Sequence, residues 1–207
     1  MKNNYMTVGL TGQTGSGKSS LSVFLSDNGF FVIDCDKVSR NVTRDGSECC
    51  KKLREHFPSC FDEALHLDRK ALGAIVFSDQ EKLSLLDRLI FPFILSEIKT
   101  LINSAVDNGF RVIVLDAPTL FESGAYKLCN TVVSCVAREE VRRDRIMKRD
   151  GLTAEQAMTR IKAQKSESFF ITNSDIIIEN GGGTDSLCRA ADFLSSRLKE
   201  MLYGCKH

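Results

Sequence analysis

One octapeptide near the N-terminus has the residue types and the spacing of a phosphate-binding loop. Residues 12–19 match the pattern G-x-x-x-x-G-K-[ST] at every fixed position. Glycines here let consecutive backbone N–H groups turn toward one phosphate, and the helix that follows adds the positive end of its dipole. The Lys18 ammonium can reach the β- and γ-phosphates, and the Ser19 hydroxyl can bind Mg²⁺. The octapeptide therefore predicts a nucleoside triphosphate site.

A glycine-rich turn could match this pattern by chance. Here it lies between an apolar stretch and an amphipathic helix, which is the context that the function requires. The residues expected to bind the nucleotide are Gly12, Gln13, Thr14, Gly15, Ser16, Gly17, Lys18, Ser19 and Ser20.

Carboxylates follow two further apolar stretches. Asp116 ends the run at 112–115 and, as in a Walker B strand, can hold Mg²⁺ directly or through water, although a merely solvated residue is the alternative. Asp34 and Asp36 end the run at 30–33. A carboxylate there can accept the proton of an alcohol that attacks the γ-phosphorus. Asp36 could instead only cap the helix that follows it.

A basic segment at residues 138–165 can supply cations over a transferred phosphoryl group. It carries nine Lys or Arg against five Asp or Glu, an excess of +4 in a chain whose net charge is +1. Arg145 and Arg149 are four residues apart and share a helix face. Gly151 breaks this helix, and Thr153 with Gln156 predicts a capping box that opens the next one. We expect a lid at about residues 143–170 that closes over the triphosphate, and the alternative is a solvated basic face.

An alternation of strands and helices has to position these residues. Buried strands are predicted at five apolar runs, which are 6–11, 30–34, 111–116, 131–136 and 175–179. Apolar runs separated by helices are typical of a parallel sheet that is covered on both faces. The last helix carries an apolar stripe at 4-3-4-3 spacing, made of Leu187, Ala191, Leu194, Leu198 and Met201. The predicted fold is α/β, a P-loop kinase fold with a five-stranded parallel sheet flanked by helices.

We expect one domain over residues 1–207, with a core of 1–46 and 109–207. The stretch at about 47–108 is too long for one crossover helix and is expected to be a helical insert that binds the acceptor, punctuated by Pro58 and Pro92. Gly181, Gly182 and Gly183 predict a tight turn before the last helix.

Composition excludes several classes of protein. A chain of 207 residues with 43% hydrophobic and 27% charged residues is an ordinary globular domain and is not broadly disordered. A net charge of +1 argues against a protein that coats nucleic acid. No apolar run approaches the roughly 18 residues needed to span a bilayer, and the polar N-terminus does not resemble a signal peptide. We therefore expect neither a nucleic-acid nor a membrane partner.

The cysteines and histidines indicate a cytoplasmic protein without a histidine metal site. The eight cysteines contain no C-x-x-C pair, and several lie in apolar runs, so reduced thiols are expected rather than disulfides. The three histidines are scattered along the chain and form no set of metal ligands.

The nucleotide site favours a small kinase that uses ATP and Mg²⁺. GTPases need an N-K-x-D tetrapeptide, which this chain lacks, and large ATPase motors need more length. Two alternatives stay open: another small-molecule kinase of the nucleoside monophosphate type, and a non-catalytic protein that uses ATP as a switch. Asp34 and Asp36 suit an alcohol acceptor better than a pocket that reads a base.

Taken in order, these segments resemble the dephospho-CoA kinase family. Residues 32–36 followed by Arg40 are similar to its V-I-D-A-D signature with an arginine four positions on. Residues 116–124 resemble its D-V-P-L-L-F-E segment, and residues 145–152 resemble its lid. Arg160, Ile161, Gln164 and residues 175–180 also fall at the family's spacing, and the resemblance runs from residue 7 to about 200.

The resemblance implies transfer of the ATP γ-phosphoryl group to the 3′-hydroxyl of dephospho-CoA, the last step of coenzyme A synthesis. It points to Asp36 as the base, so Asp34 is assigned to the metal or to water, and Lys18, Arg145 and Arg149 are the other expected catalytic residues. Asn180 is expected at the nucleotide. The expected acceptor residues are Asp34, Asp36, Arg40, Asp116 and Pro118, and the expected Mg²⁺ ligands are Ser19, Asp34 and Asp116.

The chain departs from the family's pattern outside the phosphate loop and the aspartate pair. These departures bear on acceptor contacts and lid closure and not on the class of reaction. They are Phe91 for histidine, Thr119 for leucine, Asn130 for aspartate, Arg142 for glutamine, and Ser168, Phe169 and Phe170 for a stretch that usually carries Glu and Lys.

Overall fold

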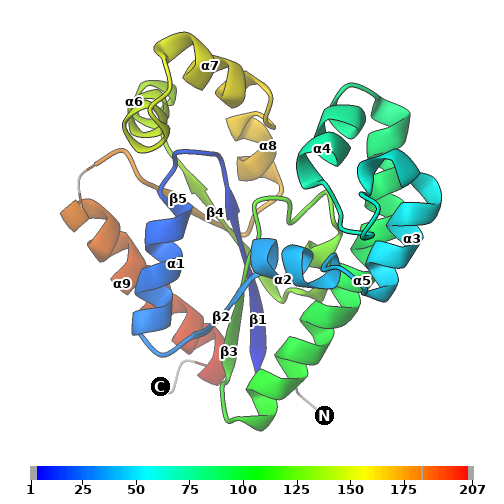
Figure 1. Cartoon of the computed structure of the whole chain (residues 1–207). Coiled ribbons are helices and arrows are strands. Elements are labelled where there is room, and N and C mark those ends of the chain that lie inside the picture. Colours follow the sequence, from blue (N-terminus) through cyan, green and yellow to red (C-terminus); the bar gives the residue numbers. More distant parts are fainter. Residues whose placement is uncertain (1–3, 183, 205–207) are drawn as a thin grey trace. The chain divides into compact units, whose positions relative to one another are not determined.

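A five-stranded sheet with the strand order β2-β3-β1-β4-β5 is the framework of the fold, which a computed structural model describes for residues 4–182 and 184–204 (Figure 1). β1 pairs in parallel with β3 and β4, and β4 pairs in parallel with β5. The predicted α/β class with a five-stranded parallel sheet is confirmed. The strands are β1 (Met6–Gly12), β2 (Phe31–Asp34), β3 (Val112–Asp116), β4 (Thr131–Val136) and β5 (Ile176–Glu179).

An apolar core holds the glycine-rich turn at both of its ends. Val8 and Leu10 of β1 are fully buried and pack in one cluster with Leu21 and Leu25 of α1 (Lys18–Asp27). α9 (Thr184–Tyr203) contributes to the same cluster and contacts α1. The strand before the turn and the helix after it are therefore anchored in one core, which restricts where the turn can lie.

The apolar stripe predicted for α9 is correct except at its last residue. Ala191, Leu194 and Leu198 are fully buried, whereas Met201 is 43% exposed. Leu202 packs against the core instead, because it follows Leu198 by four residues and continues the buried face. The turn predicted before this helix includes Gly183, which lies outside the described residues.

The basic segment forms two helices that pack as a pair. α6 (Glu139–Asp150) ends at Gly151, which adopts the left-handed conformation with φ 66°. Thr153 caps α7 (Ala154–Lys162), and both bonds of the predicted capping box with Gln156 are present, at 3.0 and 3.3 Å. Ile146 of α6 is buried against Ala157 and Ile161 of α7. A short helix, α8 (Glu167–Thr172), follows before β5.

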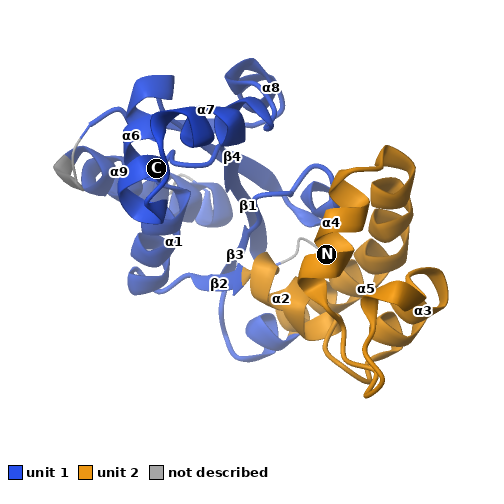
Figure 2. Ribbon diagram, turned by 45° about the horizontal axis from the view of Figure 1, so that its top comes forward, with its two compact units in different colours: residues 1–33, 104–207 blue, residues 34–103 orange. Residues whose placement is uncertain are grey.

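Residues 34–103 form a second compact unit that is mostly helical, and the first unit contains residues 1–33 and 104–207 (Figure 2). Leu53 and Phe57 of the helical unit are buried together with Leu72 and Val76. The helical unit begins at Asp34, while the expected insert begins at about residue 47, because the first short helix after β2 belongs with this unit. Its helices are α2 (Cys35–Val42), α3 (Glu48–His56), α4 (Arg69–Phe77) and most of α5 (Gln80–Asp107), with a 3-10 turn at Pro58–Cys60.

The expectation that Pro92 punctuates this stretch is wrong, because α5 continues through it. Apolar side chains are packed on both sides of the proline: Leu89 and Ile90 precede it, and Phe93 and Ile94 follow it. This packing outweighs the cost of a proline inside a helix, which is about 3 kcal/mol.

Within the described residues, α5 is the one helix long and apolar enough, by length and composition alone, to cross a membrane. Core helices of globular proteins have the same composition. Leu83, Leu86 and Phe93 pack against the apolar cluster of the helical unit. These side chains are partly buried, and 22% of the apolar window of α5 is buried within the structure.

Candidate active site

The phosphate loop leaves β1 at the place where the order of the strands reverses. β1 lies between β3 and β4, so the chain crosses to one side of it after α1 and to the other side after β3. In open parallel sheets, ligands bind at the carboxyl ends of the strands at such a switch point. Gly12 ends β1 with φ 148°, and a side chain there would collide with the backbone of Cys135 in β4. The loop thus depends on glycine for its approach to the neighbouring strand.

The carbonyl groups of the loop are held by side chains that come from far along the sequence. Arg145 of α6 donates from Nη1 to the carbonyls of Gly15 and Ser16, both at 3.3 Å. Asn180, which is buried, donates from Nδ2 to the Ser16 carbonyl at 2.7 Å, and the Cys135 thiol lies 3.3 Å from the same oxygen. These contacts bring two predicted site residues, Arg145 and Asn180, to the phosphate loop.

Two further side chains hold both polar groups of Thr14. Arg142 Nε donates to the Thr14 carbonyl at 3.0 Å, and the Thr14 N–H donates to Gln164 Oε1 at 2.7 Å. Neither Arg142 nor Gln164 is among the site residues predicted from the sequence. The local excess of basic residues was a signal for the helix that carries Arg142, and the resemblance to the family singled out positions 142 and 164, but neither signal assigned these side chains to the phosphate loop.

This outer shell of contacts explains how the loop can present donors to a phosphate. In a trans peptide the C=O and the N–H point in opposite directions. Because the Ser16 carbonyl is bound from outside, the Gly17 N–H that follows it faces the inside of the loop, whereas the Ser16 N–H donates to the Gln13 carbonyl at 3.1 Å. The N–H groups of Lys18 and Ser19 begin α1 without a carbonyl of the helix before them and add to this set, and the Ser20 N–H donates to the Gly17 carbonyl at 3.1 Å.

Lys18 and Asp116 form an ion pair within the site. Both side chains are largely buried, with 14% and 13% of their surfaces exposed. Asp116 ends β3 and lies opposite Leu10 of β1 in the sheet, which places it beside the start of the loop. Each charge compensates the other, because a single unpaired charge at a largely buried position would destabilise the fold. A triphosphate offers Lys18 a stronger partner and would leave Asp116 available to another cation.

The donors at this position fit Mg²⁺. Ser19 and Asp116 offer a hydroxyl and a carboxylate, which are the hard oxygen ligands that Mg²⁺ prefers. Within the part of the chain that the structure describes, no three His, Cys, Asp or Glu side chains gather as a metal site. Mg²⁺ at phosphates needs only one or two carboxylates, because water and substrate fill its other positions.

Asp34 and Asp36 take different places at the start of α2. Asp34 is the N-cap of this helix, and its Oδ1 accepts a hydrogen bond from the Lys37 N–H at 3.0 Å. Partial burial raises the pKa of Asp34, but the bonds and the charge of Lys37 outweigh this and hold the pKa below its usual value. Asp36 lies in the first turn and is exposed. The alternative in which Asp36 is the cap is therefore wrong, because Asp34 ends the strand and fills that position.

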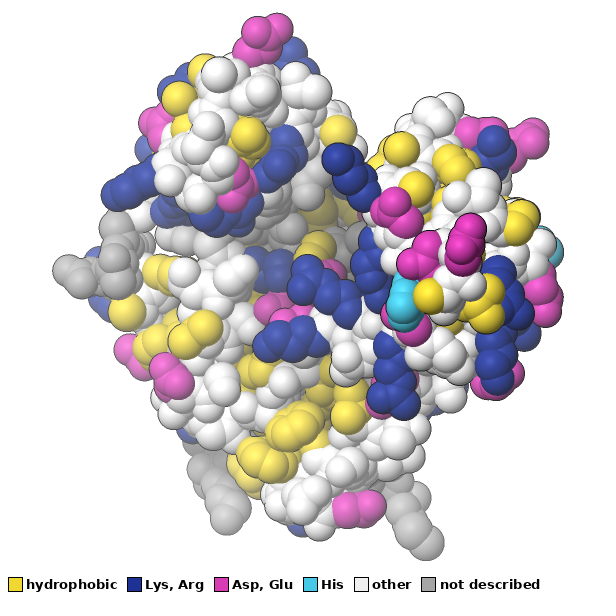
Figure 3. Space-filling model, in the orientation of Figure 1, with side chains coloured by type: hydrophobic (Ala, Val, Ile, Leu, Met, Phe, Trp, Pro, Cys, Tyr) yellow, Lys and Arg dark blue, Asp and Glu magenta, His cyan; other side chains and the backbone are white. Residues whose placement is uncertain are grey.

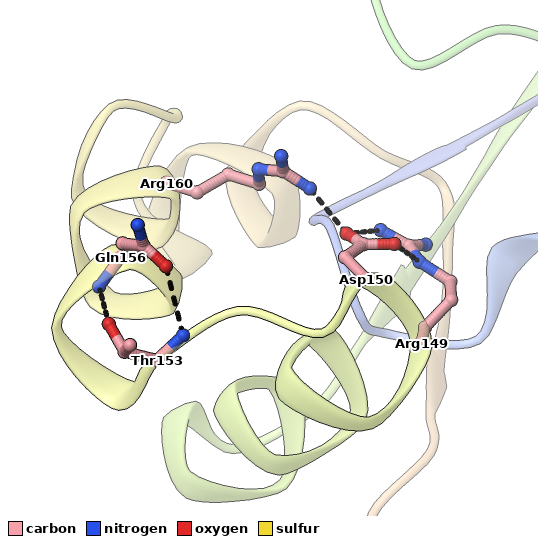
Figure 4. A network of polar contacts seen from close by, with 5 residues as sticks. All are labelled: Arg149, Asp150, Thr153, Gln156 and Arg160. Carbon is pink, nitrogen blue, oxygen red and sulfur yellow. Dashed lines mark hydrogen bonds and ion pairs between the residues drawn. The ribbon is translucent and has the colours of Figure 1, made fainter.

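Arg149 is bound at the other end of α6. Its guanidinium pairs with Asp150 at 2.7 Å, and Arg160 of α7 pairs with the same carboxylate (Figure 4). Both arginines and the capping box thus meet at the turn between the lid helices. In this structure Arg149 therefore supports the junction of the two helices, and its predicted catalytic role stays a prediction.

The remaining expected acceptor residues lie in both units. Arg40 is exposed in the last turn of α2, and its carbonyl accepts a bond from Arg69 at 3.3 Å. The carbonyl of Pro118, after β3, lies 3.4 Å from the hydroxyl of Thr11 at the end of β1. Pro118 thus lies next to the phosphate loop within the first unit.

We expect Gly17→Ala to abolish ATP binding and to destabilise the protein more than Gly29→Ala does. Both glycines have positive φ, 99° and 83°, a conformation that costs other residues about 1–2 kcal/mol. A side chain at Gly17 would also collide with the Asn180 amide, whereas nothing lies within 4 Å of one at Gly29. Calorimetric titration with ATP and the melting temperatures of both variants test this. Equal losses of stability, with ATP binding intact in both, would contradict it.

Comparisons with known proteins agree on one family. The family model for dephospho-CoA kinase matches residues 6–186. A dephospho-CoA kinase of Oryza sativa subsp. japonica is 41% identical over 179 residues, which cover 86% of this chain and 78% of the relative. One of Fusobacterium nucleatum is 35% identical over 192 residues, which cover 90% and 95%.

Solved structures give the same result. The structure of a dephospho-CoA kinase from Campylobacter jejuni superposes with a TM-score of 0.70 at 25% identity and covers 96% of this chain and 98% of that chain. TT1252 from Thermus thermophilus superposes with a TM-score of 0.79 at 29% identity, with 94% and 98% covered. A shikimate kinase from Bacteroides thetaiotaomicron, at 15% identity and a TM-score of 0.52, shares the fold alone.

Proposed function

This chain belongs to the dephospho-CoA kinase family, and from that premise we propose how its residues transfer the γ-phosphoryl group of ATP to the 3′-hydroxyl of dephospho-CoA. The observation that carries the proposal is the match to the family over residues 6–186, together with a complete phosphate loop at the switch point of the sheet. ATP is the co-substrate, and the reaction is a phosphotransfer to an alcohol.

Residues 12–20 bind the phosphates of ATP in this proposal. Backbone N–H groups of the loop and of the first turn of α1 donate to the β-phosphate, and Lys18 binds between the β- and γ-phosphates. Charge on the transferred group is spread over its oxygens in the transition state, so fixed donors and cations stabilise that state most. Arg145 and Asn180 keep the loop in shape by holding its carbonyls.

Asp36 is the proposed base for the 3′-hydroxyl. Asp34 caps α2, and its lowered pKa makes it a weaker base than an ordinary aspartate. Asp36 keeps an exposed carboxylate one turn into the helix. Arg40 and Pro118 are proposed to contact the acceptor, with Asp36 taking the proton as the oxygen attacks the γ-phosphorus.

Ser19 and Asp116 are the proposed ligands of Mg²⁺. When bound, the ion would neutralise charge on the β- and γ-phosphates. Asp34 was predicted as a third ligand, but its carboxylate already caps α2 and pairs with Lys37 at 3.4 Å. We therefore assign the ion to the first unit.

The basic helices α6 and α7 are proposed to move as a lid. Figure 3 shows many lysine and arginine side chains on the surface of this part of the molecule. Ile146, Ala157 and Ile161 hold the two helices together, and Arg142 and Arg145 tie α6 to the phosphate loop, so the two helices would move as one body about these contacts. Closure over the triphosphate would exclude water, which would otherwise compete with the acceptor for the phosphoryl group.

We expect ATP with Mg²⁺ to slow hydrogen exchange in residues 143–170, because closure orders a segment that is more mobile without ligand. Peptides of α9 around Leu194 are the internal control, since they lie in the core and should not change. Equal protection of the lid with and without nucleotide would favour the solvated-face alternative.

The function itself is tested by the product. ADP release should depend on dephospho-CoA, and a single turnover should place the new phosphate on the 3′-oxygen of the ribose. Turnover with nucleoside monophosphates and not with dephospho-CoA would identify a different small-molecule kinase. Tight ATP binding without any acceptor-dependent turnover would identify a switch protein.

A cytoplasmic location is proposed from the chemistry of the cysteines. The seven cysteines that the structure describes are free, and Cys205 lies outside the described residues. Burial raises the pKa of Cys49 to about 11 and that of Cys129 to about 12, so these thiols are unreactive side chains of the core. Free buried thiols are typical of a reducing compartment.

A further inference from the structure

A cavity of about 360 Å³ lies beside the phosphate loop within the first unit. Its volume is at the lower end of the range for small-molecule sites. Gln13 of the loop and Arg142 of α6 line the cavity. It is also lined by three residues that come after α7 in the chain, Gln164, Lys165 and Ser166. No residue that was predicted for the acceptor lines it.

Arg142 is the unusual member of this lining. It is a charged side chain with only 3% of its surface exposed, and Nε is bound to the Thr14 carbonyl. Nη2 has no hydrogen-bond partner among the residues that the structure describes, and the charges of Glu139 and Glu167 compensate that of Arg142 only in part. A buried charge that is incompletely hydrogen-bonded is costly, so proteins rarely keep one unless a ligand or water completes it.

The charges around the cavity favour an anion. Lys162 and Lys165 lie on its rim, both exposed, and Glu139 and Glu167 lie there too. With Arg142 this gives three positive groups against two negative ones. Burial lowers the pKa of Arg142, and the two glutamates only partly offset this effect. Among the described residues, Gln13 Oε1 is a second buried atom without a hydrogen-bond partner. It is an acceptor, so the attraction for an anion comes from Arg142 and the two lysines.

We propose that this cavity is a second anion site beside the phosphate loop, and that it binds a phosphate or pyrophosphate group through the Arg142 guanidinium and Lys162. The group belongs either to the acceptor itself or to a free phosphorylated compound. It is not the phosphate that is transferred.

Occupancy of the cavity would act on the nucleotide site through Thr14. Arg142 and Gln164 both line the cavity, and they hold the two polar groups of the Thr14 peptide. An anion that binds the Arg142 guanidinium therefore affects the hydrogen bond by which Arg142 holds the Thr14 carbonyl of the phosphate loop. Binding at the two sites is then coupled, and the coupling is the same in both directions.

The test is calorimetric titration with inorganic pyrophosphate. Wild-type protein should bind it at two sites, and Lys18→Ala should retain only the cavity. Adding Arg142→Gln to Lys18→Ala should weaken the remaining binding by about 10- to 100-fold, the usual loss for one charge-assisted hydrogen bond. Arg143→Gln in the same background is the matched control, since Arg143 is the next residue on α6 and its guanidinium donates to Asp144.

Each outcome decides the proposal. Loss of all pyrophosphate binding in Lys18→Ala would show that the cavity holds only water and would overturn it. Residual binding that is the same with Arg142→Gln and Arg143→Gln would place the anion elsewhere. If Arg142→Gln does not fold, Lys162→Ala must weaken the residual binding instead, because Lys162 does not contact the loop. Competition by dephospho-CoA would assign the cavity to the acceptor, and its absence to a free phosphorylated compound.

Discussion

Asp36→Asn is expected to cut acceptor-dependent turnover by about 10²–10⁴-fold, the usual loss when a general base is removed. The substitution keeps the size of the side chain but removes its basic oxygen. A ribose hydroxyl is a poor nucleophile near neutral pH, so the transfer should depend on a group that takes its proton. ATP affinity should stay within about twofold, because Asp36 is not part of the phosphate loop. Steady-state kinetics with dephospho-CoA and calorimetry with ATP measure the two quantities.

Asp34→Asn is the matched control for this variant. Asparagine is as good an N-cap as aspartate, so the bond to the Lys37 N–H and the start of α2 should survive. If Asp34 only caps the helix, the loss of turnover should be small. A dead Asp34→Asn beside an active Asp36→Asn would show that the two roles are reversed.

Lys18→Ala is expected to lower turnover by about two or more orders of magnitude. The loss should fall mainly on kcat, because the charge that Lys18 neutralises grows on the γ-phosphoryl group in the transition state. The effect should persist at saturating ATP, which separates it from a simple loss of affinity. Unchanged turnover in this variant would contradict the assignment of the phosphate loop.

The ion pair with Asp116 provides the control for stability. Removing Lys18 alone leaves a largely buried carboxylate without its partner, which destabilises a protein more than removing both charges. Lys18→Ala with Asp116→Ala should therefore melt at a higher temperature than Lys18→Ala and remain inactive. Recovery of activity together with stability would show that the lysine acts only through the fold.

The sequence was sufficient for several features that rest on local pattern. The phosphate loop is contiguous, so its eight residues contain all the glycines and the lysine that its geometry requires. The strands were predictable because short apolar runs that are separated by helices are typical of a sheet covered on both faces. The break at Gly151 and the capping box at Thr153 were predictable because helix ends are set by the residues at the ends themselves.

The tertiary structure decided what depends on residues far apart in the chain. The order of the strands places β4 beside β1 and β5 beside β4. This order brings to the loop four side chains from 128 to 164 positions away, which are Arg142, Arg145, Gln164 and Asn180. Arg142 and Arg143 are neighbours of the same type, yet one is buried against Thr14 and the other is bound to Asp144. Pro92 remained within a helix because packing on both of its sides outweighed its local preference. Burial of this kind is a property of the whole packed core, so no pattern within a single segment could reveal it.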